Sequence, residues 1–345
     1  MLIGVYYPES PLGRLPGKRL EALAAEAVRQ HVQLVFFDEK GVDLKRNLVK
    51  GQTFERGRWT ERELPLPSVV IDEQPRPPAD RSPIEQSLSR RVTFASHAIQ
   101  GKLRTMELLQ RSDSLRRLLI PTAPARDASD VLRALEAYGR VVLKPDNGRQ
   151  GEGIVAVEAD GLYYRWLEGF RLQKLDFAML DRAVRALGRN GLYLVQPYIN
   201  CVTEKGEPFD FRIRAQRNGE GGWTVTRIYP RLGQPGAVAS SSRGRNGRTI
   251  ELEPFLKERF PQQHPFIERH LRHLALEIAA CADGGSDFPL DELEIDLAID
   301  EGLRTWFYEA DTSPQAADHE PEWAVHTIAY AKRIAARAAA ASNLR

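Results

Sequence analysis

The segment VVLKPDNGRQGEGIV, residues 141–155, joins two β-branched runs through a glycine-rich loop. Lys144 ends the first run, and Gly148, Gly151 and Gly153 follow where backbone N–H groups can approach an anion. Because strand resumes after the loop, we expect a β-hairpin whose tip cradles phosphate groups. A P-loop or a dinucleotide fingerprint would instead run into a helix. The alternative is an ordinary glycine-rich hairpin with a solvated lysine.

A second pattern, near the C-terminus, alternates acidic and apolar residues. In ELEIDLAID, residues 292–300, the apolar side chains share one face of a predicted strand and the acidic side chains share the other. After a turn, TWFYEAD at residues 305–311 reads as a second strand, on which Glu309 and Asp311 share a face. We therefore expect a hairpin with a row of carboxylates along one surface.

The register of this hairpin decides which carboxylates face one another. If Asp300 pairs with Thr305, Asp296 lies opposite Glu309, with about 4.5–5.5 Å between their Cβ atoms. A tighter turn would place Glu294 opposite Glu309 instead. Opposed like charges are destabilising unless a cation lies between them, and Mg²⁺ and Mn²⁺ prefer carboxylate ligands. We interpret the pattern as a divalent metal site, and a solvated acidic face is the alternative.

Four motifs occur in order along the chain. They are Gly101-Lys102 before a helix, Lys144-Pro145 with the glycine loop, LVQPYI at residues 194–199, and EADTSP at residues 309–314. This combination resembles the ATP-grasp superfamily. Residues 206–217, GEPFDFRIRAQR, and the region around Trp59 are similar to its YheC/YheD-like branch, known in sporulating bacteria as endospore coat-associated proteins.

The resemblance implies an α/β (α+β) protein with an ATP-grasp fold and an N-terminal pre-ATP-grasp α/β domain. We place the first domain at residues 1–95, the lid or small subdomain with the glycine loop at 96–193, and the large subdomain with the metal site at 194–345. A proline-rich linker or turn is expected at residues 72–80. Residue patterns predict strands at 3–7, 33–37 and 68–72, a hairpin at 48–64, and helices at 17–30, 129–138, 176–189, 263–282 and 323–341.

The resemblance also implies a set of nucleotide-binding residues. They are Lys102, Lys144, Gly148, Gln150, Gly151, Gly153, Gln196, Tyr198, Ile199 and Glu204. Lys144 is expected at the α and β phosphates, and residues 196–199 form the hinge whose backbone binds adenine. Val142, Tyr198 and Leu297 are expected to line the adenine pocket. Glu204 is favoured over Glu207 as the carboxylate that binds ribose.

Arginines are expected at the end of the site where the phosphate is transferred. Asp210, Arg212 and Arg214 alternate along a predicted strand and therefore share one face, which we expect to line the cleft. We place Arg212 and Arg231 against the transferring phosphate, where a planar donor fork binds better than a lysine. A surface ion pair is the alternative for Arg231.

The resemblance maps the metal ligands to Asp296, Glu309 and Asp311. Asp311 occupies a position where relatives usually carry asparagine, and Gln315 replaces a frequent glycine. The extra negative charge of Asp311 should tighten binding of a hard cation. It need not prevent catalysis, because aspartate offers the same oxygen geometry as asparagine. The segment SSSRGRNGR at residues 240–248 is either an anion-binding loop for the acceptor or a flexible polar connection.

Composition indicates a cytoplasmic enzyme and excludes little else. The 345 residues carry a net charge of +2, which gives no reason to expect nucleic acid as a partner. The N-terminus lacks the pattern of a signal peptide, and no long apolar run predicts a membrane span. Cys201 and Cys281 are expected as reduced thiols. A homodimer and association with a spore coat stay open.

These patterns lead to one functional hypothesis and two alternatives. We expect a ligase that uses ATP and Mg²⁺, with Mn²⁺ as a substitute, to join a carboxylate to an amine through an acyl phosphate. The acceptor is a small molecule or a peptide. The first alternative is a kinase that phosphorylates a small-molecule hydroxyl group, and the second is a spore-coat structural protein with a relic nucleotide site.

Overall fold

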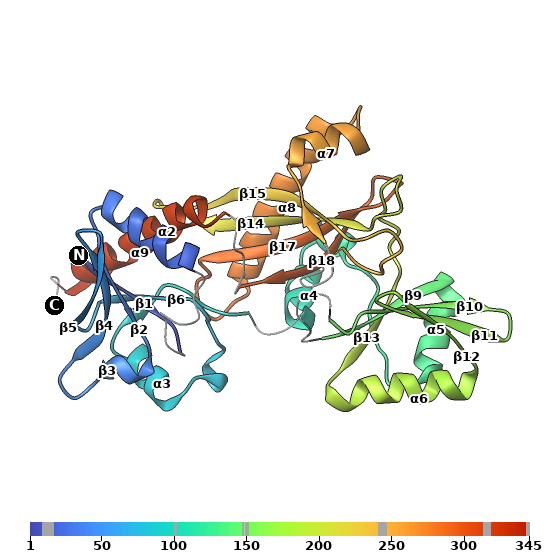
Figure 1. The fold of residues 1–345 in the computed structure, drawn as a ribbon, viewed down its shortest axis with the longest axis horizontal. Helices are drawn as coiled ribbons and strands as arrows, with labels where there is room; N and C mark the ends of the chain where they lie inside the picture. Colours follow the sequence, from blue (N-terminus) through green and yellow to red (C-terminus); the bar gives the residue numbers. More distant parts are fainter. Residues whose placement is uncertain are drawn as a thin grey trace.

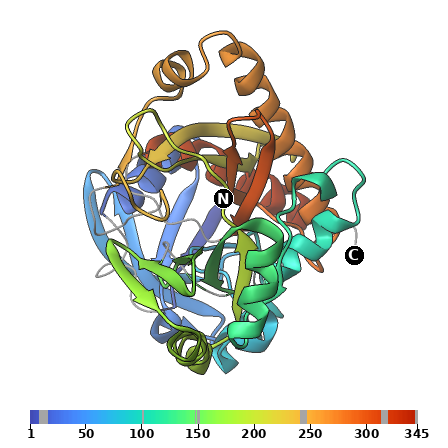
Figure 2. The same ribbon diagram turned by 90° about the vertical axis from the view of Figure 1, so that its right-hand side faces the viewer.

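The computed structural model describes residues 1–8, 17–99, 102–146, 148, 152–240, 247–312 and 319–342. Within this part the strands form three sheets, which lie in a row in Figure 1. An N-terminal sheet lies at one end and a central sheet lies in the middle. The sheet at the other end, formed by strands within residues 123–197, is called the small sheet after the predicted small subdomain. Figure 2 turns the small sheet toward the viewer. The fold class is the mixed α/β class predicted from the sequence.

The N-terminal sheet has the described strand order β3-β4-β2-β1-β6-β7, with β5 beside β4. Its strands are β1 (Leu2–Tyr6), β2 (Gln33–Phe37), β3 (Val42–Asp43), β4 (Leu48–Glu55), β5 (Arg58–Pro65), β6 (Val69–Asp72) and β7 (Thr93–Phe94). Strands β2, β1, β6 and β7 are parallel, and the apolar runs of β1, β2 and β6 are buried, which is typical of parallel strands that are covered on both faces.

Helices cover both faces of this sheet. Helix α3 (Pro83–Ser89) packs against one face through Leu88, whereas α2 (Gly17–Arg29) and α9 (Glu320–Ser342) pack against the other. Figure 1 shows α9, the last helix of the chain, beside α2. Arg19 of α2 is buried and bonds Glu320 of α9 at 3.1 Å. The C-terminal helix therefore ties the end of the chain to its beginning.

The small sheet is antiparallel, in the order β12-β11-β10-β9-β13-β8. Its strands are β8 (Ala123–Pro124), β9 (Arg140–Pro145), β10 (Val155–Asp160), β11 (Tyr163–Glu168), β12 (Arg171–Leu175) and β13 (Tyr193–Pro197). Helices α5 (Ala128–Tyr138) and α6 (Phe177–Leu187) pack on one face. Their N-caps are Asp127 and Asp176, whose carboxylates accept bonds from backbone N–H groups in the first turn.

The central sheet is also antiparallel, in the order β16-β15-β14-β17-β18. Its strands are β14 (Phe209–Arg217), β15 (Trp223–Leu232), β16 (Arg248–Thr249), β17 (Glu292–Ile299) and β18 (Thr305–Asp311). Helices α4 (Lys102–Gln110), α7 (Leu252–Arg259) and α8 (His264–Gly284) pack around it. Phe211, Ile213, Leu293 and Ile295 point into its apolar core. The alternate residues of the same strands form the opposite, charged face.

The predicted helices and strands all occur, and they differ from prediction only at their ends. Of residues 72–80, Asp72 ends β6, residues 73–74 form bends and Pro78–Asp80 form a short 3-10 helix, so of the two expected forms this segment is a turn. The remaining 3-10 turns are Glu39–Gly41, Arg116–Leu118 and Gly188–Asn190. The division into domains at residues 95 and 193 stays a prediction.

Two further sequence expectations concern membranes and thiols. No helix in the described part of the chain is long and apolar enough to cross a bilayer. Cys201 is buried and Cys281 half-buried, and both are free cysteines.

The pH dependence of stability should include a contribution from Asp72, at the end of β6. Burial raises the pKa of this carboxyl group to about 7, despite a bond from the Gln74 backbone. A folded-state pKa above the unfolded value means that folding stability falls as pH rises from about 4 toward 7. We expect Asp72→Asn to remove this loss and to raise the unfolding free energy at pH 8 by about 2–4 kcal/mol.

Urea unfolding followed by circular dichroism at pH 5 and pH 8 measures the effect. Asp113→Asn is the control, since the Asp113 side chain is 91% exposed. An Asp72→Asn variant with the same pH dependence as the wild type would contradict the assignment.

Candidate functional site

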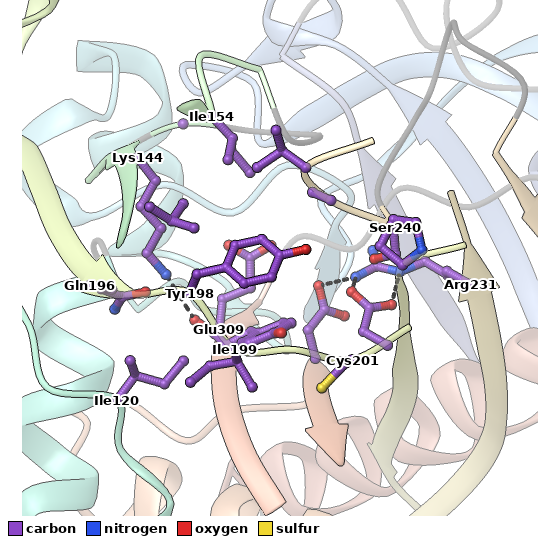
Figure 3. Close-up of a pocket in the computed structure, with 18 of the residues that line it drawn as sticks. Ile120, Lys144, Ile154, Gln196, Tyr198, Ile199, Cys201, Arg231, Ser240 and Glu309 are labelled. Atoms are coloured by element: carbon purple, nitrogen blue, oxygen red, sulfur yellow. Dashed lines mark hydrogen bonds and ion pairs between the residues drawn. The ribbon is translucent and has the colours of Figure 1, made fainter. Parts of the chain in front are cut away.

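One pocket lies where the small sheet meets the central sheet, and Figure 3 shows its walls. It encloses about 880 Å³, including space open to solvent. Strands β9 and β13 and the residues after β13 supply one side, and β14, β15, β17 and β18 supply the other. Residues from Ile120 to Glu309 in the sequence therefore meet around one pocket.

The glycine hairpin forms as predicted. Strands β9 and β10 pair antiparallel, with Leu143 opposite Val155, and the loop joins their ends. Lys144 is buried at the pocket wall, and its Nζ lies 3.4 Å from the backbone oxygen of Tyr308 on β18. The lysine therefore spans from the small sheet to the central sheet. An ordinary hairpin with a solvated lysine does not describe this arrangement.

Two of the predicted loop glycines, Gly148 and Gly153, lie in the described part of the loop, and their role in binding phosphate stays a prediction. Gly148 lines the pocket. Gly153 has a φ of +71°, and a Cβ atom there would lie 2.5 Å from the Tyr193 hydroxyl oxygen. A side chain at Gly153 would therefore need both an unfavourable backbone conformation and a displaced neighbour. Gln150 and Gly151 lie outside the described residues.

The second predicted lysine begins a helix, as expected. Helix α4 starts at Lys102, and the next backbone N–H, of Leu103, donates to Asp146 Oδ1 at 3.3 Å. Asp146 directly follows β9, so the start of α4 lies beside the glycine loop. The Lys102 side chain itself is outside the described part of the structure, and its role stays a prediction.

The predicted hinge lines the apolar part of the pocket. Gln196, Tyr198 and Ile199 are at the wall, as labelled in Figure 3. Gln196 Nε2 donates to Thr122 Oγ1 at 2.7 Å, which fixes its amide group. The Tyr198 backbone N–H donates to the Arg140 carbonyl, and the Arg140 guanidinium lies 3.7 Å from the centre of the Tyr198 ring. These contacts hold the hinge rigidly beside the pocket.

The apolar wall differs from the prediction at one position. Val142 and Tyr198 line the pocket, but Leu297 points into the core on the other face of the central sheet. Ile120, which sequence patterns do not mark, lines the pocket instead. The alternation of residues 292–300 places Leu297 on the face opposite the acids, which is confirmed; only its assignment to the pocket, implied by the resemblance, is wrong.

The candidate ribose carboxylates are not at the pocket wall. Glu204 lies exposed in a turn, whereas Glu207 is buried. Glu207 accepts bonds from Arg248 at 2.8 Å and from the Thr203 hydroxyl group at 3.2 Å, and the hydrogen bond from Arg248 lowers its pKa. The pocket-lining residues include neither glutamate. The ribose assignment therefore stays a prediction without support from this geometry.

The charged face of the central sheet brings the predicted arginines and acids together through strand register. Asp210 on β14 lies opposite Arg231 on β15. Two residues along β14, Arg212 lies opposite Asp296 on β17, which in turn lies opposite Glu309 on β18. Each of these arginines therefore lies opposite an acid on a neighbouring strand, whereas across β17 and β18 two acids face each other.

The next row continues the same pattern. Arg214 lies opposite Glu294, which lies opposite Asp311. Arg214 is buried against the ring of Trp323 at 4.0 Å and bonds Glu292 at 2.6 Å. The acidic row predicted on β17 therefore exists, but it is buried and matched by arginines rather than solvated.

Asp296 is the centre of this ion-pair network and is only 2% exposed. Arg212 donates from Nε and Nη2 to its two carboxylate oxygens, both at 2.9 Å. Arg231 Nη2 donates to the same carboxylate at 2.6 Å. Burial alone would raise the pKa of Asp296, but the two guanidinium groups hold it well below its ordinary value. Asp296 is therefore charged at neutral pH.

Glu294 responds to burial in the opposite direction. It is 4% exposed, and burial raises its pKa to about 7 although Arg212 Nη1 lies 2.5 Å away. Its Oε2 atom is buried and has no hydrogen-bond partner among the described residues. On the charged face, the ionised form is therefore stabilised at Asp296 and destabilised at Glu294.

The predicted pairing of Asp296 with Glu309 is confirmed, although the turn differs from the one assumed. Ile299, not Asp300, pairs with Thr305. That shift would move Asp296 off Glu309, but a β-bulge between Asp296 and Leu297 restores the register. The extra residue on β18 is Tyr308, whose carbonyl group receives the bond from Lys144. The bulge therefore aligns the acids and re-aims a carbonyl group at the hairpin lysine.

The carboxylates present fit a hard divalent cation in their chemistry. Asp296 and Glu309 face one another, Asp311 follows on the same face, and all three offer oxygen ligands. In the described part of the chain, no three acidic, histidine or cysteine side chains converge closely enough to hold a metal ion. Arg212 and Arg231 instead neutralise Asp296. A cation at Asp296 would compete with these arginines for the carboxylate oxygens.

Several pocket residues were not predicted from the sequence. They are Ile120, Glu152, Ile154, Cys201, Pro208, Phe209, Val238, Ala239 and Tyr308. Asp210 lies on the strand face expected in the cleft and does line the pocket, whereas Arg212, expected at the transferring phosphate, is not among the pocket-lining residues. Burial and the neighbouring carboxylates raise the Cys201 pKa to about 12, so this thiol is an inert wall residue. Residues 241–246 of the polar loop and 313–318 lie outside the described part.

A family model described as YheC/D-like ATP-grasp matches residues 91–338. The endospore coat-associated protein YheD of Bacillus subtilis (strain 168) is 22% identical over 299 residues, which are 81% of this chain and 63% of that protein. The chain thus spans less than two thirds of this relative's length.

Solved structures share the fold. D-alanyl-alanine synthetase A from Vibrio cholerae has a TM-score of 0.57 at 12% identity, covering 97% of this chain and 98% of that chain. N5-carboxyaminoimidazole synthetase from Staphylococcus aureus, complexed with ADP, has a TM-score of 0.56 at 13% identity, covering 96% and 77%. At these identities the likeness concerns the fold alone.

The buried network predicts different costs for two acidic substitutions. Asp296→Ala leaves Arg212 and Arg231 without their shared carboxylate and should lower the metal-free unfolding free energy by about 3–5 kcal/mol. Glu309→Gln relieves repulsion between opposed carboxylates and should change it by less than about 1 kcal/mol. Urea unfolding in the presence of a chelator measures both. Equal losses in the two variants would show that Asp296 is not the centre of the network.

Proposed function

The chain belongs to the YheC/D-like ATP-grasp family, and from this premise we propose that it is an ATP- and Mg²⁺-dependent ligase that joins a carboxylate to an amine. The observation that carries the proposal is the pocket in which the hairpin lysine and the charged face meet. Lys144, Arg231, Asp296 and Glu309 all line it. It combines cationic groups for phosphates with carboxylates for a hard cation, next to an apolar hinge.

In the proposed reaction the nucleotide lies with adenine against the hinge. Val142, Ile120 and Tyr198 supply apolar surface for the base, and Lys144 with the glycine loop receives the phosphates. Lys144 would exchange its contact with the Tyr308 carbonyl oxygen for a phosphate oxygen, which is the stronger, charge-assisted bond. Nucleotide binding would thus release the lysine from the central sheet.

The charged face performs the transfer in this proposal. Mg²⁺, held by Asp296, Glu309 and Asp311, would neutralise charge on the phosphate oxygens. Arg231 lines the pocket and would stabilise the γ-phosphoryl group as charge moves during transfer. Arg212, held against Asp296 and Glu294, would keep the carboxylates in place. The acceptor carboxylate would take the γ-phosphoryl group of ATP to form an acyl phosphate, with ADP as the leaving group, and an amine would then attack the acyl carbon and release phosphate and a proton.

The partner and location are proposed from the named relative. The relative is described as endospore coat-associated, and we propose the same association for this chain, with the acceptor either a small molecule or a peptide. A relic site in a coat structural protein is disfavoured by the buried ion pairs around Asp296, because such pairs are costly to keep.

Nucleotide binding should depend on Lys144. We expect Lys144→Ala to weaken binding of ADP with Mg²⁺ by about 1.5–3 kcal/mol, since one charge-assisted phosphate contact is lost. Isothermal titration calorimetry measures the change. Lys174→Ala is the matched control, because Lys174 lies on β12 of the same sheet and is solvent-exposed. Unchanged affinity in a correctly folded Lys144→Ala protein would remove the phosphate role.

An isotope experiment separates a ligase from a kinase. The acceptor is first found by incubating the protein with ATP and a cell-extract metabolite pool and identifying products by mass spectrometry. A ligase given a carboxylate-¹⁸O acceptor and an amine moves one labelled oxygen into released phosphate. We expect labelled phosphate. A stable product that carries the γ-phosphate of ATP would instead establish a kinase and leave the nucleotide site unchanged.

A further inference from the structure

Arg231 differs from an ordinary ion-pair partner because its guanidinium group binds two separate carboxylates. Its Nε and Nη2 atoms donate to the two oxygens of Asp210 at 2.7 and 2.5 Å. The same Nη2 atom donates to Asp296 at 2.6 Å. Asp210 is 3% exposed, lines the pocket and lies directly across from Arg231 in the sheet. The side-on fork to Asp210 therefore fixes the plane of the guanidinium group.

In the proposed reaction a divalent cation would weaken the contact of Arg231 with Asp296 but not its contact with Asp210. Asp296 is a proposed ligand of the divalent cation, and a cation at its carboxylate would compete with Arg231 for the same oxygens. The cation would also repel the guanidinium group. Arg231 is 11% exposed in its side chain, so a displaced guanidinium group has little solvent to receive it. Asp210 supplies the contact that persists when the contact to Asp296 is given up.

Arg212 has the same double arrangement. It binds Asp296 through Nε and Nη2, and its Nη1 lies 2.5 Å from Glu294. Arg212 and Arg231 therefore both bind Asp296, and each also binds a second carboxylate, Glu294 for Arg212 and Asp210 for Arg231. Asp210 differs from Glu294 because it is at the pocket wall, where the position of its arginine bears on a bound phosphate.

We propose that Asp210 is a positioning residue that holds the Arg231 guanidinium group at the γ-phosphate end of the pocket once Asp296 binds a divalent cation. The inference rests on the proposed function. It assigns to Asp210 no contact with the nucleotide. Its effect should therefore be seen only with ligands that carry a γ-phosphate, and only when Arg231 is present.

The test compares two probes, ADP and the non-hydrolysable analogue AMP-PNP, each titrated with Mg²⁺ by calorimetry. Asp210→Asn keeps the shape of the side chain but removes its charge. We expect AMP-PNP to bind about tenfold more weakly and ADP to change by less than about twofold. In an Arg231→Ala background, Asp210→Asn should have no further effect on AMP-PNP, since coupled residues are non-additive.

Asp283→Asn is the matched control. Asp283, on α8, pairs with Arg217, which is on the same strand as Asp210, and Asp283 does not line the pocket. This variant should therefore leave the ratio of the AMP-PNP and ADP affinities unchanged. Asp210→Glu keeps the charge and provides a second variant if Asp210→Asn does not fold. It should give a ratio between those of the wild type and Asp210→Asn, again only when Arg231 is present.

The outcomes separate the inference from the function on which it rests. Equal losses for ADP and AMP-PNP, an unchanged ratio in both Asp210 variants, or the same loss without Arg231 would each overturn the positioning role. A wild-type protein that binds neither nucleotide would overturn the proposed function itself. A wild type that binds both, with an unaffected Asp210→Asn variant, would overturn the inference alone.

Discussion

The arrangement of the site depends on compensation of the buried charge of Asp296. A carboxylate that is 2% exposed is expensive unless it is paired, and Arg212 and Arg231 provide that pairing from two different strands. Their own partners, Glu294 and Asp210, extend the network along the sheet. The order of β15, β14 and β17 is therefore an electrostatic requirement as well as a packing solution. The charge of Asp296 is therefore already compensated within the protein, and a cation that bound its carboxylate would compete with Arg212 and Arg231.

The β-bulge at Tyr308 connects this network to the small sheet. One extra residue in β18 restores the alignment of Asp296 with Glu309 and directs a backbone oxygen at Lys144. The hairpin lysine and the acids thus meet the same short segment of strand. Binding of a phosphate group at Lys144 would therefore change a contact of β18, the strand that carries Glu309 and Asp311. The reason is that Lys144 bonds the Tyr308 carbonyl group of that strand.

Local patterns were enough to predict most strands and helices and the glycine hairpin. Alternation and turn residues act over short distances, so these features are encoded locally. The pairing of Asp296 with Glu309 was predicted from a turn register that the structure does not have, and it holds only because the bulge at Tyr308 compensates. The arginine compensation of Asp296 was not predicted, because Arg212 and Asp296 are 84 positions apart and meet only through strand order. Ile120 was missed because it too reaches the pocket only through the tertiary fold, whereas Leu297 was assigned to the pocket from the resemblance although the alternation placed it on the core face. The bulge was missed because no residue type at Tyr308 signals it.

The position of α9 has a consequence for how the chain acquires its structure during synthesis. This helix covers the face of the N-terminal sheet that contains Ile3 and Val5, and its Glu320 bonds the buried Arg19. The ribosome makes the strands of that sheet before the helix, so until α9 has emerged the apolar face is covered only in part, by α2. During that interval the remaining apolar surface is exposed to aggregation. Synthesis of α9 is thus itself a folding step.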